Sequence, residues 1–167
     1  MSYIKIHLRS SDQAKAFAMM NYTAIKNASF VDFSNLCEPT NLFDEEQWEL
    51  KGHILLKKRL EEVLDKLKHN YPDFKFPVSS IERRPGSKLQ GAVDLKDFTD
   101  SRGHWTGLSI DISPRVVIET MSYNKFVSIM HKTGLIRPYT RNTKPETWHF
   151  SLPFTDIKNW YQKEYVL

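Results

Sequence analysis

The chain has 167 residues, of which 40% are apolar and 13% aromatic, so it can bury a core and is not expected to be disordered. This length predicts a single domain over residues 1–167. Twenty-four Lys and Arg against twenty Asp and Glu give a net charge of +4. That mild bias favours an anionic partner without identifying it, and no basic tract or RNA-binding signature accompanies it.

Cys37 is the only cysteine in the chain. It excludes an intrachain disulfide and a multi-cysteine metal site, and we expect a small, partly buried apolar residue. The first residues, MSYIKIHLRSSDQ, lack the apolar run of a secretory signal, and no stretch is long and apolar enough to span a bilayer. The expected location is the cytoplasm, or the cell wall after release without a signal peptide.

The first 70 residues predict a mainly helical part. Tyr3–Leu8 alternates apolar and polar residues and predicts a short strand, whereas Asp12–Asn27 has apolar residues at helical spacing. Asn35–Phe43 contains a proline and two asparagines and predicts a loop. Glu45–His69 is the strongest predicted helix, because an apolar stripe runs through its charged residues.

The second half predicts a small sheet with a helix inserted into it. Ser122 is expected to cap a helix over Tyr123–Thr133, which Gly134 ends. The predicted strands are Pro77–Glu82, Leu108–Ile112, Leu135–Tyr139 and Trp148–Leu152, and Pro153–Tyr165 predicts a closing helix. The fold class is therefore α+β, with a small, mostly antiparallel sheet packed by helices.

Two of the six histidines, His104 and His149, have neighbours that suggest chemistry. The other four are not assigned to a site: His7 lies on the first predicted strand, and His53, His69 and His131 are expected on solvated helix faces.

His104 and Asp111 are seven residues apart, so on one uninterrupted strand their side chains would point to opposite faces. Gly103 and Gly107 can adopt backbone angles that other residues avoid. A turn at either glycine would let His104 and Asp111 converge on one point. The alternative is a loop histidine and a strand aspartate bonded to backbone.

Glu146 precedes His149 by three residues, which suits a metal ligand with a general base beside it. Trp148 and Phe150 are expected to face the core and to orient the strand. The alternative is a strand histidine next to an exposed loop glutamate. Taken together, the two segments offer two imidazoles, one carboxylate ligand and a spare carboxylate, which is how a catalytic zinc site is composed. A mixed set of this kind would also accept other divalent ions.

These segments resemble the motifs of the zinc D-alanyl-D-alanine carboxypeptidases and dipeptidases. That group includes phage endolysins, and the hedgehog signalling domain shares its fold. The first family motif, Ser-x-His-x-x-Gly-x-Ala-x-Asp, is similar to His104-Trp-Thr-Gly107-Leu-Ser109-Ile-Asp111. The second, Glu-x-Trp-His, matches Glu146-Thr-Trp148-His149 at every fixed position. The resemblance covers roughly residues 77–152, which would form the zinc-peptidase core.

The resemblance implies that His104, Asp111 and His149 bind Zn²⁺ and that Glu146 is the catalytic base. It also implies an upstream arginine that steadies the substrate carbonyl, for which Arg84 is chosen over Arg83. Two positions depart from the family pattern. Arg102 stands where the family has its serine, and Ser109 replaces the small alanine.

The implied function is that of a zinc metallopeptidase hydrolysing a D-amino-acid-containing peptide bond of peptidoglycan or its precursors. The expected substrate is a peptidoglycan stem peptide or a D-Ala-containing dipeptide, and the expected state is a monomer with no nucleic-acid or membrane partner. The alternative is a non-catalytic zinc-containing binding domain of the same fold. A basic nucleic-acid-binding domain ranks last, because it leaves both motifs unexplained.

Overall fold

The computed structural model describes residues 29–43, 49–81, 107–137 and 147–152. Within these ranges the chain combines short strands with helices and is of the α+β class, as predicted. The elements are β1 (Phe30–Asp32), β2 (Cys37–Pro39), β3 (Lys51–His53), α3 (Ile54–Leu67), β4 (Phe76–Ser80), β5 (Ser109–Ile112), α4 (Pro114–Val117), α5 (Tyr123–Lys132) and β6 (His149–Ser151).

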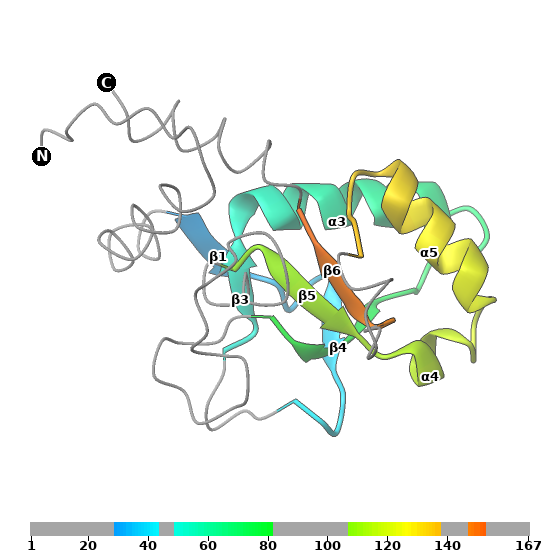
Figure 1. The fold of residues 1–167 in the computed structure, drawn as a ribbon, viewed down its shortest axis with the longest axis horizontal. Helices are drawn as coiled ribbons and strands as arrows, with labels where there is room; N and C mark the ends of the chain where they lie inside the picture. Colours follow the sequence, from blue (N-terminus) through cyan, green and yellow to red (C-terminus); the bar gives the residue numbers. More distant parts are fainter. Residues whose placement is uncertain (1–28, 44–48, 82–106, 138–146, 153–167) are drawn as a thin grey trace, which may run out of the picture.

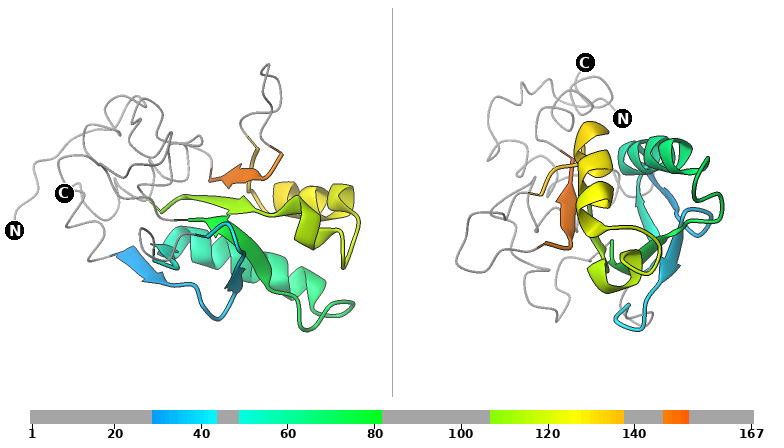
Figure 2. Two further views of the ribbon diagram at one scale, coloured as in Figure 1. Left: turned by 90° about the horizontal axis from the view of Figure 1, so that it is seen from below. Right: turned by 90° about the vertical axis from the view of Figure 1, so that its right-hand side faces the viewer.

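A four-stranded sheet in the order β2-β4-β5-β6 forms the centre of the fold. β2 runs parallel to β4, and the β4–β5 and β5–β6 pairs are antiparallel, so the predicted mostly antiparallel sheet is confirmed. β1 and β3 form a separate antiparallel pair. Helices α3 and α5 lie beside each other along this sheet (Figures 1 and 2).

The core between the helices and the sheet centres on Phe126 of α5. Its ring packs at 5.8 Å from Phe150 of β6, at 6.2 Å from Phe76 of β4 and at 6.0 Å from Phe74, measured between ring centroids. Helix α3 adds a stripe of fully buried apolar residues, which includes Leu56, Leu60 and Val63. Each such side chain stabilises the fold by about 1.5–3 kcal/mol when it is removed from water.

Helix α3 begins later than the sequence predicts. Residues 49 and 50 are not helical and residues 51–53 form strand β3, so the predicted helix over Glu45–His69 is wrong for residues 49–53. Residues 44–48 lie outside the described part. Gly52 explains the difference. A Cβ at this position would meet Ile81 at 2.9 Å and Phe33 at 3.0 Å. Glycine therefore permits close strand packing here, while it is a poor helix former.

His53 is fully buried, which corrects the expectation of a solvated helix face. It ends β3 and caps α3, because its Nδ1 accepts a hydrogen bond from the backbone N–H of Leu55 at 3.1 Å. Its ring also meets Phe30 edge to face, with centroids 6.5 Å apart. Burial lowers the pKa of His53 to about 3, so the side chain is neutral in the folded protein at ordinary pH.

The predicted loop over Asn35–Phe43 contains β2, which corrects that expectation. Pro39 fits this edge strand because its missing N–H is not needed. The bonds to β4 use the carbonyl of Leu36 and the N–H of Thr40 on either side. The division into a helical part over residues 1–70 and a core over 77–152 stays a prediction, although the described residues before 70 include three strands.

Several local predictions are confirmed. The strands predicted over Pro77–Glu82, Leu108–Ile112 and Trp148–Leu152 are β4, β5 and β6. Ser122 caps α5 by accepting from Lys125 N, and Gly134 follows the helix with a φ of +96°.

Other predicted elements are only partly formed or lie beyond the described residues. From the predicted strand Leu135–Tyr139, Ile136 forms an isolated bridge to Ser151. The short helix α4, capped by Ser113, was not anticipated. Tyr3–Leu8, Asp12–Asn27 and Pro153–Tyr165 lie outside the described residues. Within the described part, none of the helices combines the length and apolarity required to cross a membrane.

The depressed pKa of His53 predicts a pH dependence of folding. The unfolded state binds a proton near the ordinary pKa of 6.5, whereas the folded state binds it only near pH 3. This contribution to stability is therefore complete above about pH 6.5 and is lost as the pH falls toward 3, by about 1.4 kcal/mol per unit. His53→Asn keeps a capping acceptor and removes the titration.

Urea unfolding at pH 6.5 and pH 5 measures this effect. Between these values the wild type should lose about 2 kcal/mol more of its unfolding free energy than the variant does. Parallel pH profiles for the two proteins would show that His53 is not buried as a neutral side chain.

Candidate metal centre

Strands β5 and β6 have one apolar and one polar face. Their register pairs Ser109 with Ser151, Ile110 with Phe150 and Asp111 with His149. Because side chains alternate along a strand, the Ile110–Phe150 pair takes the core face and the other two pairs take the opposite one. This polar face consists of Ser109, Asp111, His149 and Ser151. All four residues are buried, and Asp111 is the most exposed of them at 5%.

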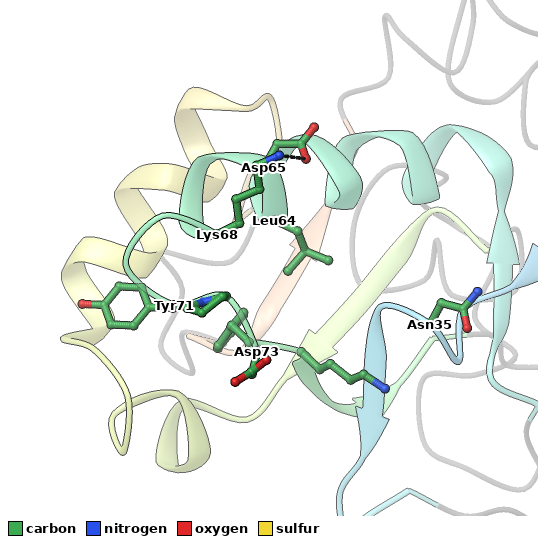
Figure 3. A pocket seen from close by; sticks show the side chains of 9 residues that line it. Asn35, Leu64, Asp65, Lys68, Tyr71 and Asp73 are labelled. Carbon is green, nitrogen blue, oxygen red and sulfur yellow. Dashed lines mark ion pairs between the residues drawn. The ribbon is translucent and has the colours of Figure 1, made fainter.

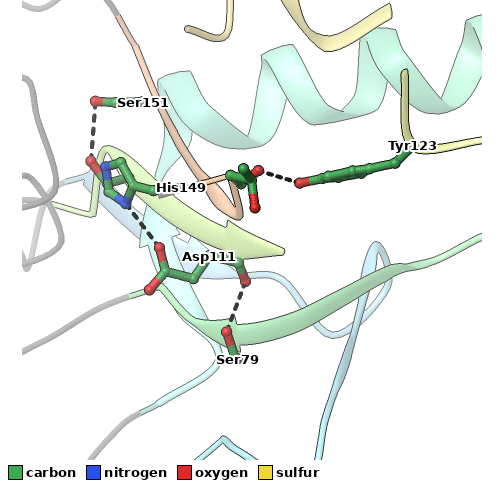
Figure 4. Close-up of polar contacts among 7 residues, drawn as sticks. Ser79, Asp111, Tyr123, His149 and Ser151 are labelled. Atoms are coloured by element: carbon green, nitrogen blue, oxygen red, sulfur yellow. Dashed lines mark hydrogen bonds and ion pairs between the residues drawn. The ribbon is translucent and has the colours of Figure 1, made fainter. Parts of the chain in front are cut away.

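Asp111 and His149 are in direct contact on the polar face. His149 Nδ1 lies 2.8 Å from Asp111 Oδ1, and Figure 4 shows the two side chains pointing toward each other. A buried carboxylate is costly unless it is hydrogen-bonded or bound to a cation, and the imidazole supplies such a partner. Asp111 and His149 thus lie together, one from each motif-like segment, whereas the expected convergence of His104 with Asp111 stays a prediction. Arg84, His104 and Glu146 lie outside the described residues, as does the competing Arg83.

The two serines of the polar face form a chain of hydrogen bonds. Ser109 Oγ donates to Ser151 Oγ at 3.1 Å, and Ser151 Oγ donates to the carbonyl of Leu152 at 3.2 Å. Both hydroxyl protons are therefore used within the sheet, which favours a structural role over a nucleophilic one. Sequence reasoning missed Ser151. Ser151 comes two residues after His149, so the alternation of side chains along a strand predicts that both lie on the same face.

Phe150 faces the core as predicted, whereas Trp148 does not. Its side chain is 40% exposed. The reason is that β6 begins only at His149, so Trp148 lies in the preceding turn. Its carbonyl still accepts a hydrogen bond from Ile112 N at 2.8 Å, which anchors the entry into β6 to the end of β5.

Gly107 forms the backbone turn expected between His104 and Asp111. Its φ is +72°, a region that favours glycine. Its carbonyl accepts a hydrogen bond from His53 N at 2.9 Å. A Cβ on Gly107 would lie 2.7 Å from that same nitrogen and 2.9 Å from the Phe30 ring. The entry into β5 is therefore fitted against β1 and β3, and only glycine satisfies both the angle and the space.

The chemistry and spacing of the Asp111–His149 pair suit a metal ion. An imidazole nitrogen and a carboxylate oxygen are both zinc donors, and two ligands of one tetrahedral zinc are about 3.3 Å apart at ordinary bond lengths. The observed 2.8 Å would have to widen by only about half an ångström, which small side-chain rotations provide. Two donors do not complete a site. The described residues contain no group of three or more His, Cys, Asp or Glu that could hold a metal.

Two other features of the described residues do not add to this centre. Cys37 is buried in β2, and burial raises the pKa of its thiol, so it remains protonated and inert. A groove of about 400 Å³ lies at the end of α3, where Tyr71, Leu64 and Asn35 line it (Figure 3). Its charges offset one another, since Lys68 pairs with Asp65 at 3.9 Å. We assign no chemistry to this groove.

Comparison with protein-family models, curated proteins and solved structures gives no match to this chain. The case for a metal centre therefore depends on the residues and their geometry.

The fit at Gly107 predicts that Gly107→Ala is strongly destabilising. Both Gly107 and Gly134 have positive φ, so alanine at either costs about 1–2 kcal/mol in backbone strain. At Gly134 the new Cβ would make only an ordinary van der Waals contact with the Arg59 side chain, at 3.9 Å, whereas at Gly107 it would collide with backbone. Gly107→Ala should therefore cost about 1–3 kcal/mol more than Gly134→Ala. Equal losses of unfolding free energy in the two variants would contradict this account.

The contact between Asp111 and His149 predicts strong energetic coupling. Replacing either residue by alanine leaves the other buried without this partner and should cost about 3–5 kcal/mol. The double variant Asp111→Ala/His149→Ala should cost less than the sum of the single changes, by about 1–3 kcal/mol. Urea unfolding with EDTA present measures this coupling in metal-free protein. Additive costs would mean that the side chains do not interact.

Proposed function

We propose that this chain is a zinc-dependent peptidase that hydrolyses a peptide bond next to a D-amino acid in peptidoglycan or its precursors. The observation that carries the proposal is the buried pair of Asp111 and His149. One residue comes from each of the two motif-like segments, and the β5–β6 register sets them directly opposite each other. The resemblance of the segments supplies the substrate class.

In this proposal His104, Asp111 and His149 hold the zinc ion. Bound zinc would supply Lewis acidity, polarising a carbonyl and making a water molecule more acidic. Glu146 would accept the proton of the attacking water and deliver it to the leaving amine. Arg84, or its neighbour Arg83, would bind the carbonyl oxygen as negative charge develops on it.

The free-energy cost of burying Asp111 and His149 supports a functional reason for their presence. Burying a carboxylate next to an imidazole costs several kcal/mol in desolvation, and well-packed apolar residues often stabilise such positions as well or better. The other face of the same two strands carries Ile110 and Phe150, both fully buried in the core. Stability alone therefore does not require Asp111 and His149 where they lie.

The alternative, a non-catalytic zinc-containing binding domain, would use the same ligands without a reaction. The two proposals differ at Glu146, because a purely structural zinc site has no need of a base. Metal content and hydrolysis therefore have to be measured on the same protein.

The test measures the zinc content of the purified chain and the release of D-alanine from D-alanyl-D-alanine, with and without chelator. We expect one zinc per chain and hydrolysis that chelator abolishes and added zinc restores, because the ion supplies the Lewis acid. Stem-peptide fragments of peptidoglycan are the second substrate. A chain that binds no metal under any of these conditions would refute the proposal.

Two variants separate binding from catalysis. Glu146→Gln should retain zinc and lose about a hundredfold or more in rate, because the base is removed while the ligands stay. Asp111→Ala should lose zinc as well as activity. A zinc-loaded wild type that cleaves neither substrate would favour the binding domain, and a Glu146→Gln protein with wild-type activity would exclude this residue as the base.

A further inference from the structure

Arg137 is a partly buried cation beside β6. Its guanidinium Nε is buried, and no acceptor in the described part of the chain takes a hydrogen bond from it. Among the described carboxylates, none forms an ion pair with this arginine. A buried donor without an acceptor is costly, and more so when the group is charged. In folded proteins such a group is often explained by a bound ion or water molecule.

The backbone next to Arg137 is held by β6. Ile136 N donates to the carbonyl of Ser151 at 2.9 Å, and Ser151 N donates to the carbonyl of Ile136 at 2.8 Å. Side chains that lie directly opposite in an antiparallel pair share a face, so Ile136 shares the polar face with Ser151. Because side chains alternate, Arg137 takes the other face, on which Phe150 packs against α5.

The electrostatics of α5 agree with this direction. Burial raises the pKa of Tyr123 at the start of the helix, the charge of Arg137 opposes the rise, and Asp111 adds to it. Burial lowers the pKa of His131 near the other end, and the charge of Arg137 lowers it further. Tyr123 and His131 are therefore uncharged at neutral pH, and Asp111 is bonded to His149. None of these neighbours supplies a counter-charge to the guanidinium.

A guanidinium suits an oxyanion, because its N–H groups form a planar fork that matches two oxygens on one centre. Hydrogen bonds of this charged kind are roughly twice as strong as neutral ones. We infer that Arg137 is an anion-binding residue, which takes a carboxylate or a phosphate group at the surface where α5 faces the chain beside β6. The partial exposure of the residue gives an ion access. A change of side-chain rotamer then turns Nε–H from the protein toward the ion.

This site is separate from the candidate metal centre. Asp111 and His149 lie on the polar face of the sheet, whereas Arg137 lies on the other face. The inference therefore does not depend on the proposed peptidase function, and its test needs neither zinc nor hydrolysis.

Nuclear magnetic resonance of the full chain tests the inference, since each arginine Nε–H gives its own signal. The probes are sodium acetate for the carboxylate and sodium phosphate for the phosphate group, each compared with sodium chloride at equal ionic strength. Arg59 is the matched control, because its guanidinium already pairs with Glu62 at 3.5 Å. Each arginine is also replaced by lysine, and the backbone N–H of Ile136 then reports binding next to the site.

We expect the Arg137 Nε–H signal to shift and to saturate with acetate, phosphate or both, whereas the Arg59 signal does not respond. The probe that saturates at the lower concentration identifies the chemistry of the ligand. Arg137→Lys should weaken binding at least about tenfold, because an ammonium lacks the paired donors of the fork. Arg59→Lys should bind as the wild type does.

Two results would overturn the inference. Equal shifts at Arg137 and Arg59 that do not saturate would mean that the salts only screen charges. Unchanged affinity in Arg137→Lys, with thermal unfolding like that of the wild type, would mean that the ion binds elsewhere. If the lysine variant fails to fold, the titration of the wild type decides the question by itself.

Discussion

The antiparallel register of β5 and β6 is the constraint on which the rest of the site depends. It sets Asp111 opposite His149 and, on the other face, Ile110 opposite Phe150. Because side chains alternate, a slip of one residue would bring Phe150 to the polar face and would separate the carboxylate from the imidazole. The apolar core therefore protects the site: any such slip would also remove Phe150 from its edge-to-face packing on Phe126.

The two faces of this strand pair make opposite contributions to stability. On the core face, α3 and α5 bury apolar side chains, which stabilises the fold. On the polar face, Asp111 and His149 are buried with a desolvation cost that their mutual hydrogen bond only offsets. The serine pair beside them uses its own hydroxyl protons and so adds no unsatisfied group. A small sheet can carry such a face because its opposite side is densely packed.

The ends of the two strands are held from outside the four-stranded sheet. At the start of β5, the Gly107 carbonyl is bound by His53 N of β3, where no larger residue fits. At the start of β6, Tyr123 of α5 binds the Thr147 carbonyl. Each restraint lies on the side of its strand from which a motif-like segment enters.

Local sequence patterns determined the elements whose causes are local. The strands β4, β5 and β6 and the helix α5 follow from apolar periodicity, the Ser122 cap and Gly134. Asp111 and His149, both selected from the sequence, are in contact in the structure, and their role as metal ligands stays a prediction. Trp148 was wrongly expected in the core, since the point at which β6 begins depends on its pairing with β5.

Tertiary contacts decided the remainder. The sequence pattern predicts a helix at Gly52 and His53. Close packing of Gly52 against Phe33 and Ile81 instead favours strand β3, and His53 caps α3. Pro39 is typical of a loop, and it lies in an edge strand here only because β2 pairs with β4. Asp111 and His149 are 38 residues apart in the sequence. The side-chain periodicity of one strand does not determine which other strand it will pair with. Patterns of side chains along the chain are local, whereas register and burial are set only when distant segments pack together.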